Sequence, residues 1–134
     1  ARVDAFQHWI YTHPGHTRQE RAARWLELEQ RFGDDLDWPM FPEWRECSWI
    51  AKLHFFCVPL YYIEYGIAQL GALQLWERFL DNQREAVDAY RYALSLGNSR
   101  PLPELFEAAG LRFAFGSETV ERLMARLAGA MAEE

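Results

Sequence analysis

One histidine and three tyrosines form the group of residues best suited to chemistry: His54, Tyr61, Tyr62 and Tyr65. If the chain is helical from residue 60 onward, Tyr65 lies three residues after Tyr62 and four after Tyr61, so either pair can direct two phenols to one place. A phenol has a reference pKa of about 10 and is a neutral hydrogen-bond donor at pH 7. Two such donors suit a developing oxyanion, and Gly66 leaves room for a substrate backbone. Periodicity alone also allows the alternative that this aromatic stripe belongs to a hydrophobic core.

A second group of histidines, His8, His13 and His16, raises the question of a metal site. The sequence His-Pro-Gly-His cannot be helical, and no Cys or carboxylate completes a ligand set at suitable spacing, which favours a turn. The 134 residues contain no His-Glu-x-x-His, Walker A, G-x-G-x-x-G or G-x-S-x-G motif. We therefore expect no metal site in this chain and no assembled catalytic signature of its own.

The composition suits one globular region rather than a nucleic-acid-binding or membrane protein. Half of the residues are hydrophobic and 16% are aromatic, which is ample material for a core. A net charge of −6 repels phosphate, so nucleic acid is an unfavourable partner. Residues 55–76 are mostly apolar, but Glu64 and two glutamines interrupt them, so we expect a buried helix and no membrane span.

The two cysteines, Cys47 and Cys57, lack CxxC spacing and have apolar neighbours in the sequence. We expect free, buried thiols, as in a reducing cytoplasm. The first residues already follow a helical pattern, so we expect no signal peptide, and the missing initiator Met is in keeping with a longer parent protein.

Almost every segment has helical periodicity, which predicts an all-α fold. Thr17 and Glu20 form a capping box that opens a helix ending at Phe32, and Gly33 is expected to stop it in the left-handed conformation. A loop over residues 34–42 contains Trp38 and Met40 and is expected to pack onto the protein.

The segments around the histidine and tyrosines are expected to be two long helices. Residues 43–58 predict one helix, and Pro59 must break or kink it because proline has no backbone N–H. Residues 60–80 form the longest helical pattern. Ala68, Gly71 and Ala72 lie near one another on one face of it, and such small residues let another backbone approach closely.

Two sequence strings resemble a known family. They are WIAKLH, from Trp49 to His54, and PLYYIEYGIAQLGA, from Pro59 to Ala72. Together they resemble the C-terminal active-site helix of the oligoendopeptidase F-like zinc metallopeptidases, which are relatives of thimet oligopeptidase. Residues 4–11, 90–97, 99–101 and 105–110 resemble further segments of the same family, so the resemblance covers nearly the whole chain. Residues 1–134 are thus expected to be a single helical region, the C-terminal portion of a peptidase catalytic domain.

The resemblance implies an all-helical metalloendopeptidase that cleaves short peptides in a deep channel, with one zinc held by two His and a Glu. Those ligands precede the region seen here, so zinc belongs to the parent enzyme and this chain alone is expected to be inactive. Matched residue by residue, the resemblance implies catalytic roles for His54, Tyr62 and Tyr65 and substrate binding by Tyr61 and Gly66. It leaves open whether Tyr61 or Tyr62 carries the second phenol role.

The expected partners are short peptides and the missing zinc-bearing N-terminal part of the parent. Loss of that part would expose apolar surface and favour a homo-oligomer of the isolated chain. One alternative is a standalone helical module that binds a protein partner or an apolar ligand, suggested by the aromatic residues between Trp38 and Trp49. Another is a histidine-ligated metal or haem protein.

Overall fold

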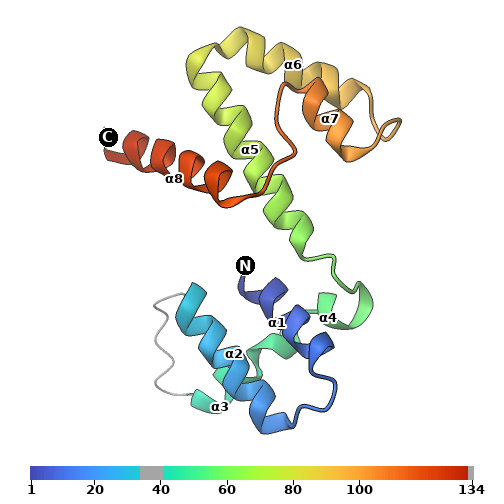
Figure 1. Ribbon diagram of the computed structural model, residues 1–134, viewed down its shortest axis with the longest axis vertical. Coiled ribbons are helices and arrows are strands. Elements are labelled where there is room, and N and C mark those ends of the chain that lie inside the picture. The colour runs from blue at the N-terminus through green and yellow to red at the C-terminus, as the bar shows by residue number, and fades with distance from the viewer. Residues whose placement is uncertain (34–40, 133–134) are drawn as a thin grey trace. The chain divides into compact units, whose positions relative to one another are not determined.

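Residues 1–33 and 41–132 are described by the computed structural model, and every regular element in these ranges is a helix (Figure 1). This confirms the predicted all-α fold. The chain divides into two compact units, Ala1–Gly66 and Ile67–Glu134. The predicted packing of Trp38 and Met40 falls outside the described residues.

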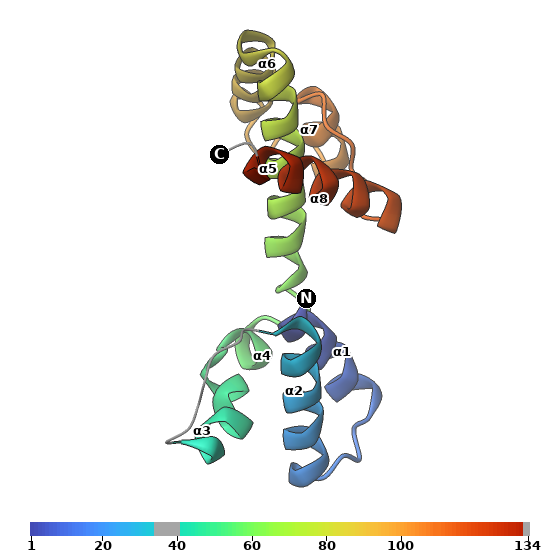
Figure 2. The same ribbon diagram turned by 90° about the vertical axis from the view of Figure 1, so that its left-hand side faces the viewer.

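The first unit begins with two helices, α1 (Arg2–Thr12) and α2 (Arg18–Phe32), which lie side by side (Figures 1 and 2). The predicted capping box is confirmed, because the Thr17 hydroxyl accepts from the Glu20 N–H at 3.2 Å and the Glu20 carboxylate accepts from the Thr17 N–H at 2.7 Å. The Thr17 N–H and hydroxyl, which both donate to this carboxylate, lower the pKa of Glu20. The prediction for Gly33 is wrong, since its backbone is extended (φ −62°, ψ 159°).

Aromatic packing holds this unit together. Its buried core consists of Val3, Phe6, Trp25 and Leu28. The Phe6 ring meets the Trp25 ring edge to face at 5.0 Å and the Phe55 ring in the same way at 5.6 Å. Edge-to-face pairs of this kind contribute about 0.5–1.5 kcal/mol beyond the area they bury. Phe6 therefore ties the first two helices to the segment that contains His54.

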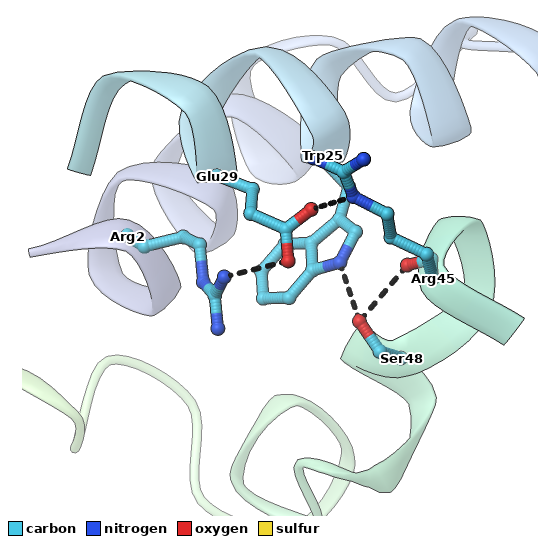
Figure 3. Close-up of polar contacts among 5 residues, drawn as sticks. All are labelled: Arg2, Trp25, Glu29, Arg45 and Ser48. Carbon is cyan, nitrogen blue, oxygen red and sulfur yellow. Dashed lines mark hydrogen bonds and ion pairs between the residues drawn. The ribbon is translucent and has the colours of Figure 1, made fainter. Parts of the chain in front are cut away.

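The predicted helix over residues 43–58 is wrong, because the chain forms three short pieces there. They are α3 (Pro42–Cys47), the 3₁₀ helix η1 (Ser48–Ala51) and α4 (His54–Cys57). At the first junction the Trp25 indole N–H donates to the Ser48 hydroxyl at 2.8 Å, and that hydroxyl donates to the Arg45 carbonyl at 2.9 Å (Figure 3). A serine bonded to a carbonyl three residues earlier favours a tight turn over a continuous α-helix.

A buried carboxylate joins three helices of the first unit (Figure 3). Glu29 on α2 accepts from the Arg2 guanidinium of α1 at 3.1 Å and from the Arg45 guanidinium of α3 at 2.6 Å. The Glu29 side chain is only 6% exposed, whereas the two arginines keep contact with water. Charge-assisted bonds of this length are stronger than neutral ones, so Glu29 fixes α3 against the first two helices.

The second unit is built on α5 (Ile63–Asp81), which begins in the first unit and continues into α6 (Gln83–Ser95), α7 (Leu102–Ala108) and α8 (Ser117–Ala132). Another segment does come close to the small face, but through a side chain and not through its backbone as predicted: a Cβ at Gly71 would lie 3.0 Å from Cζ of Phe106 on α7. Buried Gln74 donates to the Arg112 carbonyl at 3.0 Å and accepts from the Arg112 N–H at 2.9 Å, which holds the segment before α8. None of the helices described is long and apolar enough to cross a membrane.

Both cysteines are free, as predicted, but neither is fully buried. Cys47 is half-buried and Cys57 is exposed. Cys57 is the last residue of the four-residue helix α4.

Replacing Glu29 with Gln should lower the free energy of unfolding of the first unit by about 1–3 kcal/mol. Two hydrogen bonds lose their charged acceptor, but Arg2 and Arg45 can still be hydrated, which keeps the cost below that of a fully buried broken pair. Urea unfolding followed by tryptophan fluorescence measures the change.

The matched control is Glu27→Gln on the same helix. Glu27 pairs with Arg24 at 2.7 Å, but its side chain is 63% exposed. An exposed pair contributes little, so this variant should change stability by less than about 0.5 kcal/mol. Equal effects of the two variants would contradict the structural role given to Glu29.

Candidate active site

A tight turn separates α4 from α5. It follows from Pro59, which cannot donate a backbone hydrogen bond and so cannot continue the helix that ends at Cys57. The Val58 carbonyl accepts from the Tyr61 N–H at 3.2 Å. Leu60 has φ of +61°, a left-handed conformation that is uncommon for a residue with a bulky side chain. The turn thus reverses the chain within a few residues and brings the start of α5 back toward α4.

Because of this turn, α5 begins at Ile63 and not at residue 60 as predicted. Tyr61 and Tyr62 therefore belong to the turn, and only Tyr65 lies in the helix. The prediction that Tyr61, Tyr62 and Tyr65 share one helix is therefore wrong. The turn nevertheless brings their rings together.

The imidazole of His54 stands among the three phenol rings. The Tyr61 ring is stacked on it, with centroids 5.8 Å apart and planes 12° apart. The Tyr62 and Tyr65 rings meet it edge to face, at 5.1 Å and 5.8 Å. Tyr65 is also 5.9 Å from Tyr61 and 5.1 Å from Tyr62. The structure therefore brings all four residues singled out in the sequence into one aromatic cluster, His54–Tyr61–Tyr62–Tyr65.

Two members of this cluster are open to a ligand. Tyr61 is 47% exposed and Tyr65 is 53% exposed. Tyr62 is half-buried and packs against the core of the first unit, so its ring serves in part as support. The Tyr65 hydroxyl lies 3.2 Å from Nε2 of His54, which is within hydrogen-bonding distance. Phenolic and imidazole groups are thus presented together at the surface of this unit.

Gly66, the remaining sequence candidate, directly follows Tyr65 in α5. It is exposed, and a Cβ built there would meet only the end of the Ile63 side chain, at 3.9 Å. Among the described residues, packing does not require glycine at this position. A requirement for glycine would have to come from a bound molecule or another segment.

The histidines near the start of the chain form a turn. Nδ1 of His16 lies 2.6 Å from the His13 carbonyl oxygen, and Nε2 of His16 lies 3.0 Å from the Arg21 guanidinium. The Trp9 ring stacks on His13 with centroids 5.2 Å apart, and His8 contacts Asp4 on its own helix. In the described ranges no three His, Cys, Asp or Glu side chains are grouped to hold a metal ion. The residues of these ranges therefore do not fit a zinc site.

Leu60 is the residue of this site that the sequence interpretation missed. Its left-handed backbone directs the turn between Pro59 and Tyr61. Glycine or asparagine usually marks such a position, and leucine gives no signal of it. The proline one residue earlier was the only local indication that a turn occurs here.

Comparison with known proteins defines the class of protein to which this chain belongs. The family model for peptidase family M3 matches residues 1–125, and the chain belongs to this family. It is similar to the solved structure of PZ peptidase A with an inhibitor, at 30% identity and a TM-score of 0.85. It is also similar to a protein assigned as oligoendopeptidase F, at 31% identity and a TM-score of 0.82. No curated protein matches the chain.

These similarities extend over 99% of this chain but only 24% of each of the two solved proteins. The chain thus spans about a quarter of their length. The cluster His54–Tyr61–Tyr62–Tyr65 lies in the part that the family model matches.

Leu60 gives a direct test of the turn. Leu60→Gly should leave the free energy of unfolding unchanged or raise it by up to about 1.5 kcal/mol. It relieves the ~1–2 kcal/mol cost of a left-handed L-residue and adds ~0.5–1 kcal/mol of glycine backbone entropy. Leu60→Val should be destabilising, because a β-branched residue tolerates positive φ poorly.

Leu80→Gly is the control, since Leu80 is 48% exposed, as Leu60 is, but lies in the helix α5. This variant should lower the free energy of unfolding by about 0.5–1 kcal/mol, because glycine adds backbone entropy to the unfolded chain and there is no left-handed strain to relieve. Urea unfolding of the three variants measures the difference. Equal destabilisation by the two glycine variants would contradict the left-handed turn.

Proposed function

We propose that this chain, residues 1–134, is a portion of the catalytic domain of a zinc-dependent oligoendopeptidase that hydrolyses short peptides. In this proposal the cluster His54–Tyr61–Tyr62–Tyr65 contacts the peptide and stabilises the transition state. The observation that supports it is the convergence of an imidazole with two exposed phenols, the Tyr65 hydroxyl lying 3.2 Å from His54, in a chain of peptidase family M3.

The chemistry of the cluster suits amide hydrolysis. Attack on a peptide carbonyl places negative charge on its oxygen, and hydrogen-bond donors aimed at that oxygen lower the barrier. Phenols are neutral at pH 7 and donate without the desolvation cost of a buried charge. Tyr65 is the main donor in this proposal. Tyr61 is exposed enough to bind the peptide, and either Tyr61 or Tyr62 supplies the second phenol.

Zinc enters this proposal only through the parent enzyme. The family resemblance implies a zinc ion, but the described residues offer no ligand set for it. We place its ligands in sequence outside this chain, and no step assigned to these residues runs through the metal. The isolated chain is accordingly proposed to be inactive.

The proposed macromolecular partner is the zinc-bearing remainder of the parent enzyme. Trp44, Leu53 and Phe56 of the first unit are 62%, 66% and 57% exposed. Where such groups form a contiguous apolar patch, the patch marks an interaction surface. The isolated chain should therefore self-associate. Two free cysteines support a reducing, cytoplasmic setting.

A second candidate function is a helical module that binds an apolar ligand. A cavity of about 360 Å³ in the second unit favours it, with Gly71, Leu75, Leu105 and Phe106 among its lining residues. A cavity of this size is large enough for a small ligand. The effect of removing the Tyr65 hydroxyl on peptidase activity separates the two functions, because a module that binds an apolar ligand does not need this hydroxyl.

In the complete enzyme, Tyr65→Phe should lower kcat by about 10²–10³, the usual effect of removing one oxyanion donor. KM should change little, because a bond made only in the transition state does not tighten substrate binding. The ring and its packing are retained, so melting temperature and metal content should match the wild type. Steady-state kinetics on a quenched fluorescent peptide measures both constants.

Tyr92→Phe on α6 is the matched control, since Tyr92 is 56% exposed and Tyr65 is 53% exposed. It should leave kcat within about threefold of the wild type. If Tyr65→Phe does the same while metal is retained, Tyr65 does not stabilise the oxyanion.

A further inference from the structure

Three arginines from separate segments of the second unit line one cavity of about 380 Å³. Arg78 comes from α5, Arg112 from the segment between α7 and α8, and Arg122 from α8. Among the described residues that line this cavity, Glu77 is the only carboxylate. The cavity is therefore rich in guanidinium groups, and its lining shares no residue with the cluster His54–Tyr61–Tyr62–Tyr65.

Two of the three guanidiniums are fixed by bonds within the unit. Arg78 donates to the Gly110 carbonyl at 2.6 Å and to the Glu85 carboxylate at 3.1 Å. Gly110 has φ of +70°, and a Cβ at this position would collide with the Arg78 guanidinium, so glycine both adopts the turn and leaves the space. Arg122 pairs with Glu77 and so connects α8 to α5. These two groups are held in place before any ligand binds.

Arg112 is held through its backbone, which leaves its side chain available. Gln74 is only 5% exposed, and its amide accepts from the Arg112 N–H at 2.9 Å and donates to the Arg112 carbonyl at 3.0 Å. The Arg112 residue is exposed, and none of the ion pairs between described residues of the second unit includes it. A guanidinium has five N–H donors, so Arg112 can bind an acceptor with two of them at once.

The charges of this group do not balance. The three arginines carry +3 and their partners Glu77 and Glu85 carry −2, which leaves +1 in a chain whose net charge is −6. The fork of a guanidinium matches two oxygens of a carboxylate or phosphate group through parallel hydrogen bonds. An oxyanion therefore has both the charge and the shape that this group lacks.

We propose that the cavity is an oxyanion-binding site, in which the Arg112 guanidinium binds a carboxylate or phosphate group and Arg78 and Arg122 favour its negative charge. A free small anion or an acidic side chain from the remainder of the parent supplies the same chemical group. The proposal goes beyond the proposed function and does not depend on it, because peptide hydrolysis requires none of these three residues.

NMR on the full 134-residue chain tests the site directly. The arginine Nε–H and backbone amide signals are followed while sodium phosphate, and separately sodium acetate, is added at a constant ionic strength of about 0.1 M. The signals of Arg112 and Gly110 should shift and saturate, with a dissociation constant on the order of 1–10 mM. In Arg112→Gln the dissociation constant should rise about tenfold or more, because a charged hydrogen-bond donor is lost while the backbone bonds to Gln74 remain.

Arg126→Gln is the matched control. Arg126 also lies on α8, pairs with Asp81 at 3.5 Å and is 50% exposed, but it does not line the cavity. This variant removes the same charge from the same unit and should change the dissociation constant by less than about twofold.

Shifts that increase without saturation, or that sodium chloride reproduces, would overturn the proposal. Equal weakening by Arg112→Gln and Arg126→Gln would also overturn it, because only long-range charge would then be acting. No arm of this experiment measures peptide hydrolysis, so the oxyanion site and the proposed function can fail independently.

The complete enzyme distinguishes the two sources of the anion. If a free anion occupies the site, phosphate should raise the melting temperature above that in chloride of equal ionic strength, and Arg112→Gln should abolish this rise. If an acidic side chain of the parent fills the site, phosphate should give no such rise, and Arg112→Gln itself should lower the melting temperature more than Arg126→Gln does. Identical behaviour of the two variants under both conditions would overturn the site in the complete enzyme.

Discussion

The missing backbone N–H of Pro59 is the constraint from which the arrangement of this site follows. The segment from His54 cannot continue as one helix through it, so α4 ends at Cys57 and a new helix starts at Ile63. An uninterrupted helix of 1.5 Å rise per residue would place residues 54 and 65 about 16 Å apart along its axis. The break instead allows the His54 imidazole and the Tyr65 hydroxyl to meet at 3.2 Å.

The break is useful only because α4 is held in place, and the rest of the first unit does this. Phe55 packs on Phe6, which also contacts Trp25 on α2. The Trp25 indole bonds to Ser48, and Glu29 bonds to the arginines of α1 and α3 (Figure 3). A core of aromatic rings with few side-chain torsions keeps the short helix, and with it His54, in place.

Local signals in the sequence were enough to predict the helices that depend on local contacts. The capping box of Thr17 and Glu20 and the break at Pro59 are confirmed because each reflects the chemistry of residues close in sequence. The continuous helix over residues 43–58 is wrong, and one of the two hydrogen bonds of Ser48 at its first break comes from Trp25, a residue 23 positions away. The family resemblance singled out the four aromatic residues, but the turn that unites Tyr61 with His54 depends on the left-handed Leu60, which carries no sequence signal.

A tyrosine that donates to the oxyanion should strengthen binding of a transition-state analogue more than binding of a substrate analogue. A tyrosine that only packs should affect both alike. In the complete enzyme, the dissociation constants of a tetrahedral phosphinic peptide and of a matched ketomethylene peptide can be compared between the wild type and Tyr65→Phe. If the phenol donates to the oxyanion, the phosphinic peptide should bind about 10²-fold more weakly to the variant, while the ketomethylene peptide changes by less than about threefold. Equal weakening of both peptides, or of neither, would contradict the role given to Tyr65.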